Sequence, residues 1–238
     1  MRSMAAASSA DKPFFDAQLA EGNALWPAIM RCNAHPCATK NEAAGLLSLD
    51  ALASLEAWLA QLPDSGRDGE MPKDAVFFWD FSEDSRKLFL LDDGLIERLA
   101  EVAGVTLHAP ALARIVAREE RRACREALGA ELFDYAQSRG QYRTGAAGDI
   151  VARRDTELPL PERCRAHGWL ALNLCSLRWP KELRRLFLLR LARLSGEIGT
   201  AVSLGNGLSD TAWQALWRML KKCLLGEVSP SWKPYFTA

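Results

Sequence analysis

The sequence predicts a mainly α-helical fold, a compact multi-helix domain with at most one or two short strands. Apolar residues recur at spacings of three and four along several segments, which is the period of a helix that buries one face. Capping residues and glycines stand at the ends of these segments. Of the 238 residues, 49% are hydrophobic and 25% are charged, as in an ordinary globular protein, so a wholly disordered chain is excluded.

The N-terminal part is predicted to be a leader followed by helices. Residues 1–12 are expected to be disordered, and residues 13–238 to form a single helical domain, in which a division into 13–104 and 105–238 stays open. The first helix covers residues 14–31. The second follows a capping Ser48 and stops at Pro63.

The next stretch is predicted to contain a loop, a connector and a short helix. Residues 63–74 are rich in Pro, Gly and charge, which is typical of an exposed loop. The aromatic run at 75–81 fits a strand or a buried connector. A helix then begins at Asp92 or Asp93 and is expected to end at Gly104, because glycine is favoured just after a helix.

The middle of the chain is predicted to be extended at 105–108 and helical again from Pro110 to Leu128, since proline suits a first helical turn. Three apolar residues are expected on the inner side of this helix: Leu112, Ile115 and Val116. A short helix follows, and the glycine- and proline-containing residues 139–161 are expected to form a long loop.

Three helices and a tail are predicted for the C-terminal part. Residues 162–178 form the first, and residues 183–194 the second, with leucines on most sides, so that it is expected to be central. After a loop at 196–207, Ser209 caps the last helix. The aromatic tail is expected to fold back on this helix, and the candidate structural aromatics are Trp213, Trp217, Trp232, Tyr235 and Phe236.

The sequence shows no secretion or membrane signal, which predicts a cytoplasmic protein. The first residues lack the apolar core of a signal peptide, so the six cysteines are expected to be free thiols in a reducing compartment. No stretch approaches the roughly 18 apolar residues of a membrane span, so direct membrane insertion is not expected.

Candidate metal and catalytic residues do not form a known pattern. Cys32, His35 and Cys37 lack the spacing and the fourth ligand of a zinc site. His108 and His167 have no nucleophile or acid partner that the sequence implies, so a packing role is expected for both.

The acidic pairs and the glycines also match no catalytic or phosphate-binding pattern. The adjacent acids at 92–93 and 119–120 do not face each other on a helix, and the glycines near residue 205 match no phosphate-binding motif. The sequence therefore predicts no catalytic residue, no cofactor, no metal and no small-molecule substrate.

An arginine-rich segment admits two interpretations. Arg114, Arg118, Arg121, Arg122 and Arg125 could follow the phosphates of a nucleic acid, which is the alternative function considered. Interspersed glutamates and a neutral overall charge argue against that use. The preferred interpretation is a protein interface made by Arg118, Arg121, Arg122 and Arg125.

Charge is divided unevenly along the chain. Residues 1–110 hold 9 basic and 17 acidic side chains, and residues 111–238 hold 21 and 13. Regions of opposite sign attract each other or attract different partners, so two partner-binding faces of opposite sign are expected.

Three segments, in order, resemble one family. Residues 99–136 resemble the YscK/SctK (OrgA-like, HrpD-like) proteins of type III secretion, in which a short helix, a glycine–apolar–leucine stretch, a basic helix and a leucine–glycine step follow one another. Residues 23–30 are similar to the family's early helix, and residues 213–236 to its final helix and aromatic close. The matching positions in the first segment are Gly104, Val105, Leu107, His108, Leu112, Arg114, Ile115, Leu128 and Gly129.

The resemblance implies a non-enzymatic adaptor of the injectisome sorting platform, at the cytoplasmic face of the bacterial inner membrane. Such proteins link the cytoplasmic domain of the SctD-like inner-membrane ring protein to the SctQ-like pod protein. Through the pod protein they connect to the SctL-like stator and the ATPase.

Overall fold

The computed structural model describes residues 80–152, 156–195 and 208–236. Of these residues 85% are helical and none lies in a strand, which confirms the mainly α multi-helix fold. The predictions for the leader at 1–12, the helices at 14–31 and 48–63, the loop at 63–74 and the loop at 196–207 fall outside the described residues.

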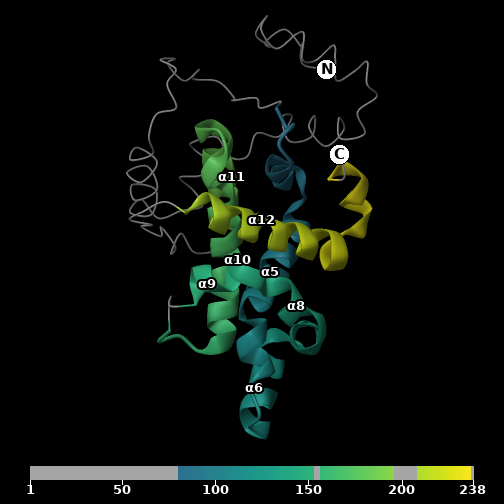
Figure 1. Cartoon of the computed structure of the whole chain (residues 1–238), viewed down its shortest axis with the longest axis vertical. Coiled ribbons are helices and arrows are strands. Elements are labelled where there is room, and N and C mark those ends of the chain that lie inside the picture. The colour runs from purple at the N-terminus through teal and green to yellow at the C-terminus, as the bar shows by residue number, and fades with distance from the viewer. Residues whose placement is uncertain (1–79, 153–155, 196–207, 237–238) are drawn as a thin grey trace, which may run out of the picture.

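The described residues form α-helices of different lengths, with short 3-10 and π segments between and beside them (Figure 1). In chain order the elements are η1 (Asp84–Leu90), α5 (Asp93–Ala113), α6 (Arg118–Leu128), α7 (Ala130–Tyr135), η2 (Ala136–Gly140), α8 (Gln141–Thr144), η3 (Gly145–Ala147), α9 (Gly148–Val151), α10 (Leu160–Cys175), η4 (Ser176–Arg178), α11 (Lys181–Ser195), α12 (Asp210–Cys223), η5 (Leu224–Val228) and η6 (Pro230–Tyr235).

The close crossing of α5 and α10 is the centre of the described fold. A Cβ atom on Gly104 would lie 1.8 Å from the Cys164 carbonyl oxygen, and one on Gly168 would lie 2.0 Å from that of Ala100. The two helices can therefore touch backbone to backbone only because both positions are glycine. The helix end predicted at Gly104 is wrong, because this glycine serves the crossing from inside α5, and the open sub-domain boundary at 104–105 also falls inside this helix.

Pro110 lies inside α5, so the prediction that residues 105–108 are extended and that Pro110 starts a helix is also wrong. A proline has no N–H to donate to the carbonyl four residues earlier, which here belongs to Thr106. The Thr144 hydroxyl donates to that carbonyl oxygen at 2.6 Å instead. A side chain from α8 thus supplies the hydrogen bond that the proline removes.

The predicted loop at 139–161 is largely helical, which corrects that prediction. Of its short turns, η2, α8 and α9 pack along α5, and η3 packs against α12. The Tyr135 hydroxyl lies 2.9 Å from that of Thr106, and a Cβ on Gly140 would lie 3.1 Å from the Ala109 Cβ. These turns are too short to be stable alone, so contacts with α5 and α12 rather than local periodicity hold them.

The helix predicted to be central, α11, packs against α10, α5 and η4, while α5 and α10 form the most extensive contact. Its Arg190 is buried and donates to the carbonyl oxygens of Phe89 and Leu91, at 2.8 and 2.6 Å, and to Asp93 at 2.6 Å. This arginine joins η1 and the start of α5 to α11. A further residue, Arg193, also pairs with Asp93.

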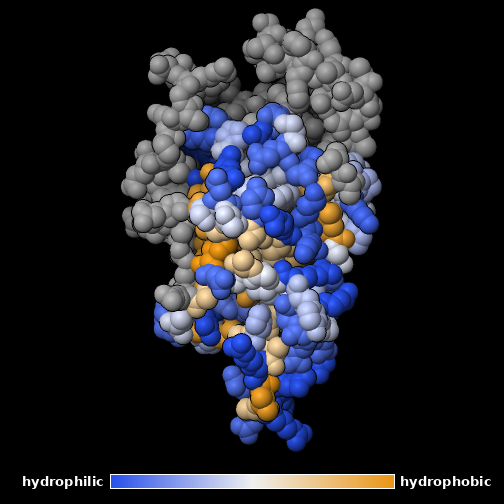
Figure 2. Space-filling model, viewed as in Figure 1, coloured by the Kyte–Doolittle hydropathy of each residue, from blue (hydrophilic) through white to orange (hydrophobic). Residues whose placement is uncertain are grey.

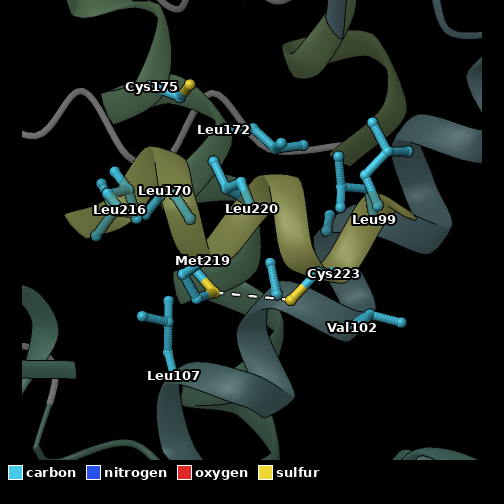
Figure 3. Close-up of a cluster of buried hydrophobic side chains, with 14 of the residues drawn as sticks. Leu99, Val102, Leu107, Leu170, Leu172, Cys175, Leu216, Met219, Leu220 and Cys223 are labelled. Carbon is cyan, nitrogen blue, oxygen red and sulfur yellow. Dashed lines mark hydrogen bonds between the residues drawn. The ribbon is translucent and has the colours of Figure 1, made fainter. Parts of the chain in front are cut away.

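Helix α12 lies across the central pair, and its inner face forms the core shown in Figure 3. As predicted, the Ser209 hydroxyl caps the helix by accepting from the Ala212 N–H at 3.2 Å. The predicted inner-face residues are all buried: Trp213, Leu216, Trp217, Leu220 and Leu224. The labelled side chains of α5, α10 and α12 in Figure 3 meet in one continuous cluster.

The aromatic tail folds back onto α12, as predicted, with Phe236 buried and its ring 6.0 Å from that of Trp217. Trp232 and Tyr235 are half-buried against the core. Trp213, also expected near the tail, instead donates from its indole to the Cys175 carbonyl at 3.0 Å.

Two lysines fasten the tail. Lys87 of η1 donates to the Tyr235 carbonyl at 2.7 Å, and Lys221 of α12 donates to the Phe236 carbonyl. Both ammonium groups also bind the Asp84 carboxylate, at 2.7 and 2.8 Å, and lie within 6 Å of the Phe236 ring centre. The tail is thus held by charge as well as by burial.

A buried histidine pair spans the central crossing. His108 Nε2 of α5 lies 2.8 Å from His167 Nδ1 of α10, so one ring donates and the other accepts. Burial, followed by the electrostatic effects of His167 and Arg163, lowers the pKa of His108 to about 4. The packing role predicted for both histidines is confirmed.

We expect Gly104→Ala and Gly168→Ala each to lower the free energy of unfolding by about 3 kcal/mol or more, because the new methyl group has no space. Urea unfolding followed by circular dichroism measures this. Gly94→Ala is the matched control: its Cβ would meet nothing nearer than 3.6 Å, so a change under about 1 kcal/mol is expected. Equal effects for all three variants would contradict the close crossing.

The histidine pair predicts a loss of stability in mild acid. An unfolded histidine has a pKa near 6.5, so the unfolded chain binds the proton first as the pH falls, and stability is lost between about pH 6.5 and pH 4. The loss attributable to His108 is about 3 kcal/mol. In His108→Gln this part of the pH dependence should vanish, so its unfolding free energy should approach that of the wild type as the pH falls. A constant difference between the two proteins from pH 7 to pH 4.5 would refute the assignment.

Candidate protein-interaction surface

Helix α6 is the most exposed helix of the described fold and lies at one end of it (Figure 1). Of its residues only Cys124 is buried, and Leu128 is half-buried. Figure 2 shows the same end as a largely hydrophilic surface with a small hydrophobic cluster. Because almost every side of α6 faces solvent, the helix contributes little to the core, and its surface is available for partners.

The helix is held in place by a tight reversal and a few polar contacts. Gly129 follows it with φ +87°, a backbone conformation that glycine adopts without strain, and the chain turns into α7. Across this hairpin Arg125 pairs with Asp134 at 2.9 Å and Arg121 donates to Gln137 at 2.6 Å. Arg165 of α10 donates to the Ala127 carbonyl at 2.5 Å.

The four arginines predicted to form an interface are all exposed, but they differ in their contacts. Three are engaged within the protein: Arg121 with Gln137, Arg125 with Asp134, and Arg122 with Glu126 at 2.7 Å. Arg118 has no hydrogen-bond or ion-pair partner among the described residues. The cationic strip is therefore partly neutralised, and its free charge lies toward the start of the helix.

The helix predicted from Pro110 to Leu128 is broken, which changes the role of one residue. α5 ends at Ala113 and α6 begins at Arg118, and the break turns Val116 outward. Leu112 and Ile115 are buried as predicted, whereas Val116 is 91% exposed and not on an inner face. Sequence periodicity could not show this, because it assumed one continuous helix.

Sequence reasoning also overlooked an exposed tyrosine. Tyr142 of α8 is 81% exposed, and it lies in the segment that was predicted to be a loop. No periodic pattern marks it, because α8 is only one turn long. Val116 and Tyr142 are the two exposed large hydrophobic side chains of the described residues.

The remaining candidate groups take structural roles. The Asp92 carboxylate caps α5 by accepting from the Leu95 N–H at 2.8 Å, and Asp93 binds Arg190. Within the described ranges no three His, Cys, Asp or Glu side chains are grouped to hold a metal ion. The cluster of Cys32, His35 and Cys37 lies outside those ranges.

The four described cysteines, at positions 124, 164, 175 and 223, are free and buried, as predicted for the helical thiols among them. No helix in the described part of the chain is long and apolar enough to cross a membrane.

Fold and surface together define a helical protein with a closely packed crossed-helix core and an exposed, charged helix α6. No family model, no curated protein and no solved structure matches the chain.

The exposed arginine contacts should contribute little to stability. Neutralising three of them together, as Arg121→Gln/Arg122→Gln/Arg125→Gln, should lower the unfolding free energy only slightly, because exposed pairs are well solvated. The difference from wild type should shrink in 1 M NaCl, where such pairs are screened.

Arg190→Gln is the comparison variant at a buried arginine. It leaves two backbone carbonyls without their donor, so it should lower the unfolding free energy by about 3 kcal/mol or more at either salt concentration. If the exposed triple variant proved as destabilised as this one, α6 would be an integral part of the core.

Proposed function

We propose that this chain is a non-enzymatic adaptor of the type III secretion sorting platform, acting in the cytoplasm at the inner membrane. It would connect the cytoplasmic domain of a SctD-like ring protein to a SctQ-like pod protein, and through it to a SctL-like stator and the ATPase. The observation that carries the proposal is the ordered resemblance of three segments, ending in the final helix and aromatic close at 213–236.

The described geometry supports an adaptor in a general way. An adaptor needs a body that keeps its binding surfaces at a fixed separation, and the crossing of α5 and α10 provides one. It also needs exposed surface that the core does not use, and nine of the eleven residues of α6 are exposed. The two largest resembling segments fall on α5–α6–α7 and on α12 with its tail.

The alternative function, nucleic-acid binding by the Arg114–Arg125 segment, is less well supported. Arg121, Arg122 and Arg125 are already engaged by polar groups of this protein. Glu119 and Glu120 are exposed between Arg118 and Arg121 and would repel a phosphate backbone.

The proposal predicts one complex containing both partners. The full chain should co-elute with the SctD-like cytoplasmic domain and the SctQ-like protein encoded with it, and light scattering should give the mass of a ternary complex. Each partner should bind without displacing the other, since an adaptor uses separate surfaces. Binding of neither partner would refute the proposed function, and retention on duplex DNA at physiological salt would favour the alternative.

A further inference from the structure

The junction between α5 and α6 carries a small surface that the core does not explain. We call it the α5–α6 tip and define it by Arg114, Val116 and Arg118. Val116 is 91% exposed, and both arginines are exposed on either side of it in the chain. Ala113, which precedes Arg114, and Ala117, which precedes Arg118, are exposed as well.

The residues of the tip are poor choices for folding alone. A valine in water forgoes the gain of burial. Arg118 occupies the first position of α6, where the helix dipole disfavours a positive charge. The residue before it, Ala117, gives the helix no side-chain cap. Positions that break several local rules together are expected at functional sites.

The charges of the tip are also free. Arg114 and Arg118 make no hydrogen bond or ion pair through their side chains with the described residues, in contrast to the three arginines further along α6. A guanidinium without an internal partner can bind a carboxylate of another molecule in bidentate fashion. Two of them flanking an apolar side chain match an apolar pocket rimmed by Asp and Glu.

A protein fits this chemistry better than a nucleic acid does. Phosphate contacts would use the two arginines but would leave Val116 in water, and the exposed Glu119 and Glu120 follow directly in the chain. A protein pocket can bury the valine and pair both arginines at once, which is the composition of an interface hot spot with a charged rim.

We propose that the α5–α6 tip is the docking site for an acidic partner protein, with Val116 inserted in an apolar pocket and Arg114 and Arg118 paired with carboxylates at its rim. The inference rests on the proposed function. Of the four arginines predicted to form an interface it keeps Arg118 alone, and it adds Arg114 and Val116. The partner is thus a protein whose surface has an apolar pocket rimmed by Asp and Glu side chains.

Binding kinetics separate the two parts of the site. The full chain, wild type or variant, is measured by surface plasmon resonance against the SctD-like cytoplasmic domain and the SctQ-like protein, from 50 to 500 mM NaCl. Val116→Ser should raise the dissociation rate for one partner about tenfold with little change in association, because it removes buried apolar area. Arg114→Gln/Arg118→Gln should slow association with the same partner and flatten its salt dependence.

Matched controls test whether the effect belongs to the tip. Tyr142→Ser alters the other exposed large hydrophobic residue, and the triple Gln variant of Arg121, Arg122 and Arg125 removes more charge from the same helix. Both should change the affinity less than the tip variants do. The tip variants should keep the wild-type melting temperature, since the side chains are exposed and Arg118→Gln relieves an unfavourable charge.

Each remaining outcome is decisive. The docking site is refuted if the wild type binds a partner and the tip variants bind that partner with the same affinity. It is also refuted if the triple variant weakens binding more than the tip variants do. In both cases the adaptor function stands. Wild-type protein that binds neither partner refutes both. If the double Gln variant instead abolishes retention on a duplex DNA and spares the protein complexes, the tip is a nucleic-acid contact and the inference fails.

Discussion

The backbone contact between α5 and α10 is the constraint on which the other contacts of the described fold depend. With glycine at 104 and 168, each helix axis approaches the other more closely than side chains normally permit. This approach brings His108 and His167 within hydrogen-bonding distance, and it creates the platform on which α12 lies. Dispersion contacts at such short range are numerous, so the crossing also defines a single register for the two helices.

Polar contacts between distant segments then close the structure around this crossing. The Thr144 hydroxyl supplies the hydrogen bond that Pro110 takes from α5, and Glu227 of η5 binds Arg143 of α8 at 2.7 Å. On the other side, Arg190 ties η1 to α11. Buried polar groups that find partners this far along the chain specify one arrangement of the helices, because any other would leave them unpaired.

Much of the helical pattern could be predicted from sequence, and the failures have a common physical cause. The capped helix starting at Ser209 was predictable because its signals are local, and so was α10. Gly104 misled because glycine both ends helices and permits close crossings, and only the partner Gly168 distinguishes the two uses. A sequence pattern holds no information on that partner.

The candidate surface, too, could be predicted from the sequence only in part. Exposure of the α6 arginines followed from composition, but which of them are occupied depends on Asp134 and Gln137, which reach them only after the turn at Gly129. The outward orientation of Val116 depends on a helix break that periodicity did not indicate. Local rules predict elements well, and they predict poorly whatever is set by contacts between elements.

The reactivity of the buried cysteine thiols can report where the protein opens locally. Burial raises the pKa of Cys164 to about 12, and it raises the pKa of Cys175 and Cys223 as well, so the reactive thiolate is scarce in the closed protein. Cys124 lies in the peripheral α6, whereas Cys175 and Cys223 lie in the core between α10 and α12. The rates at which a thiol reagent modifies these positions should therefore report how readily α6 opens and how readily the core between α10 and α12 opens.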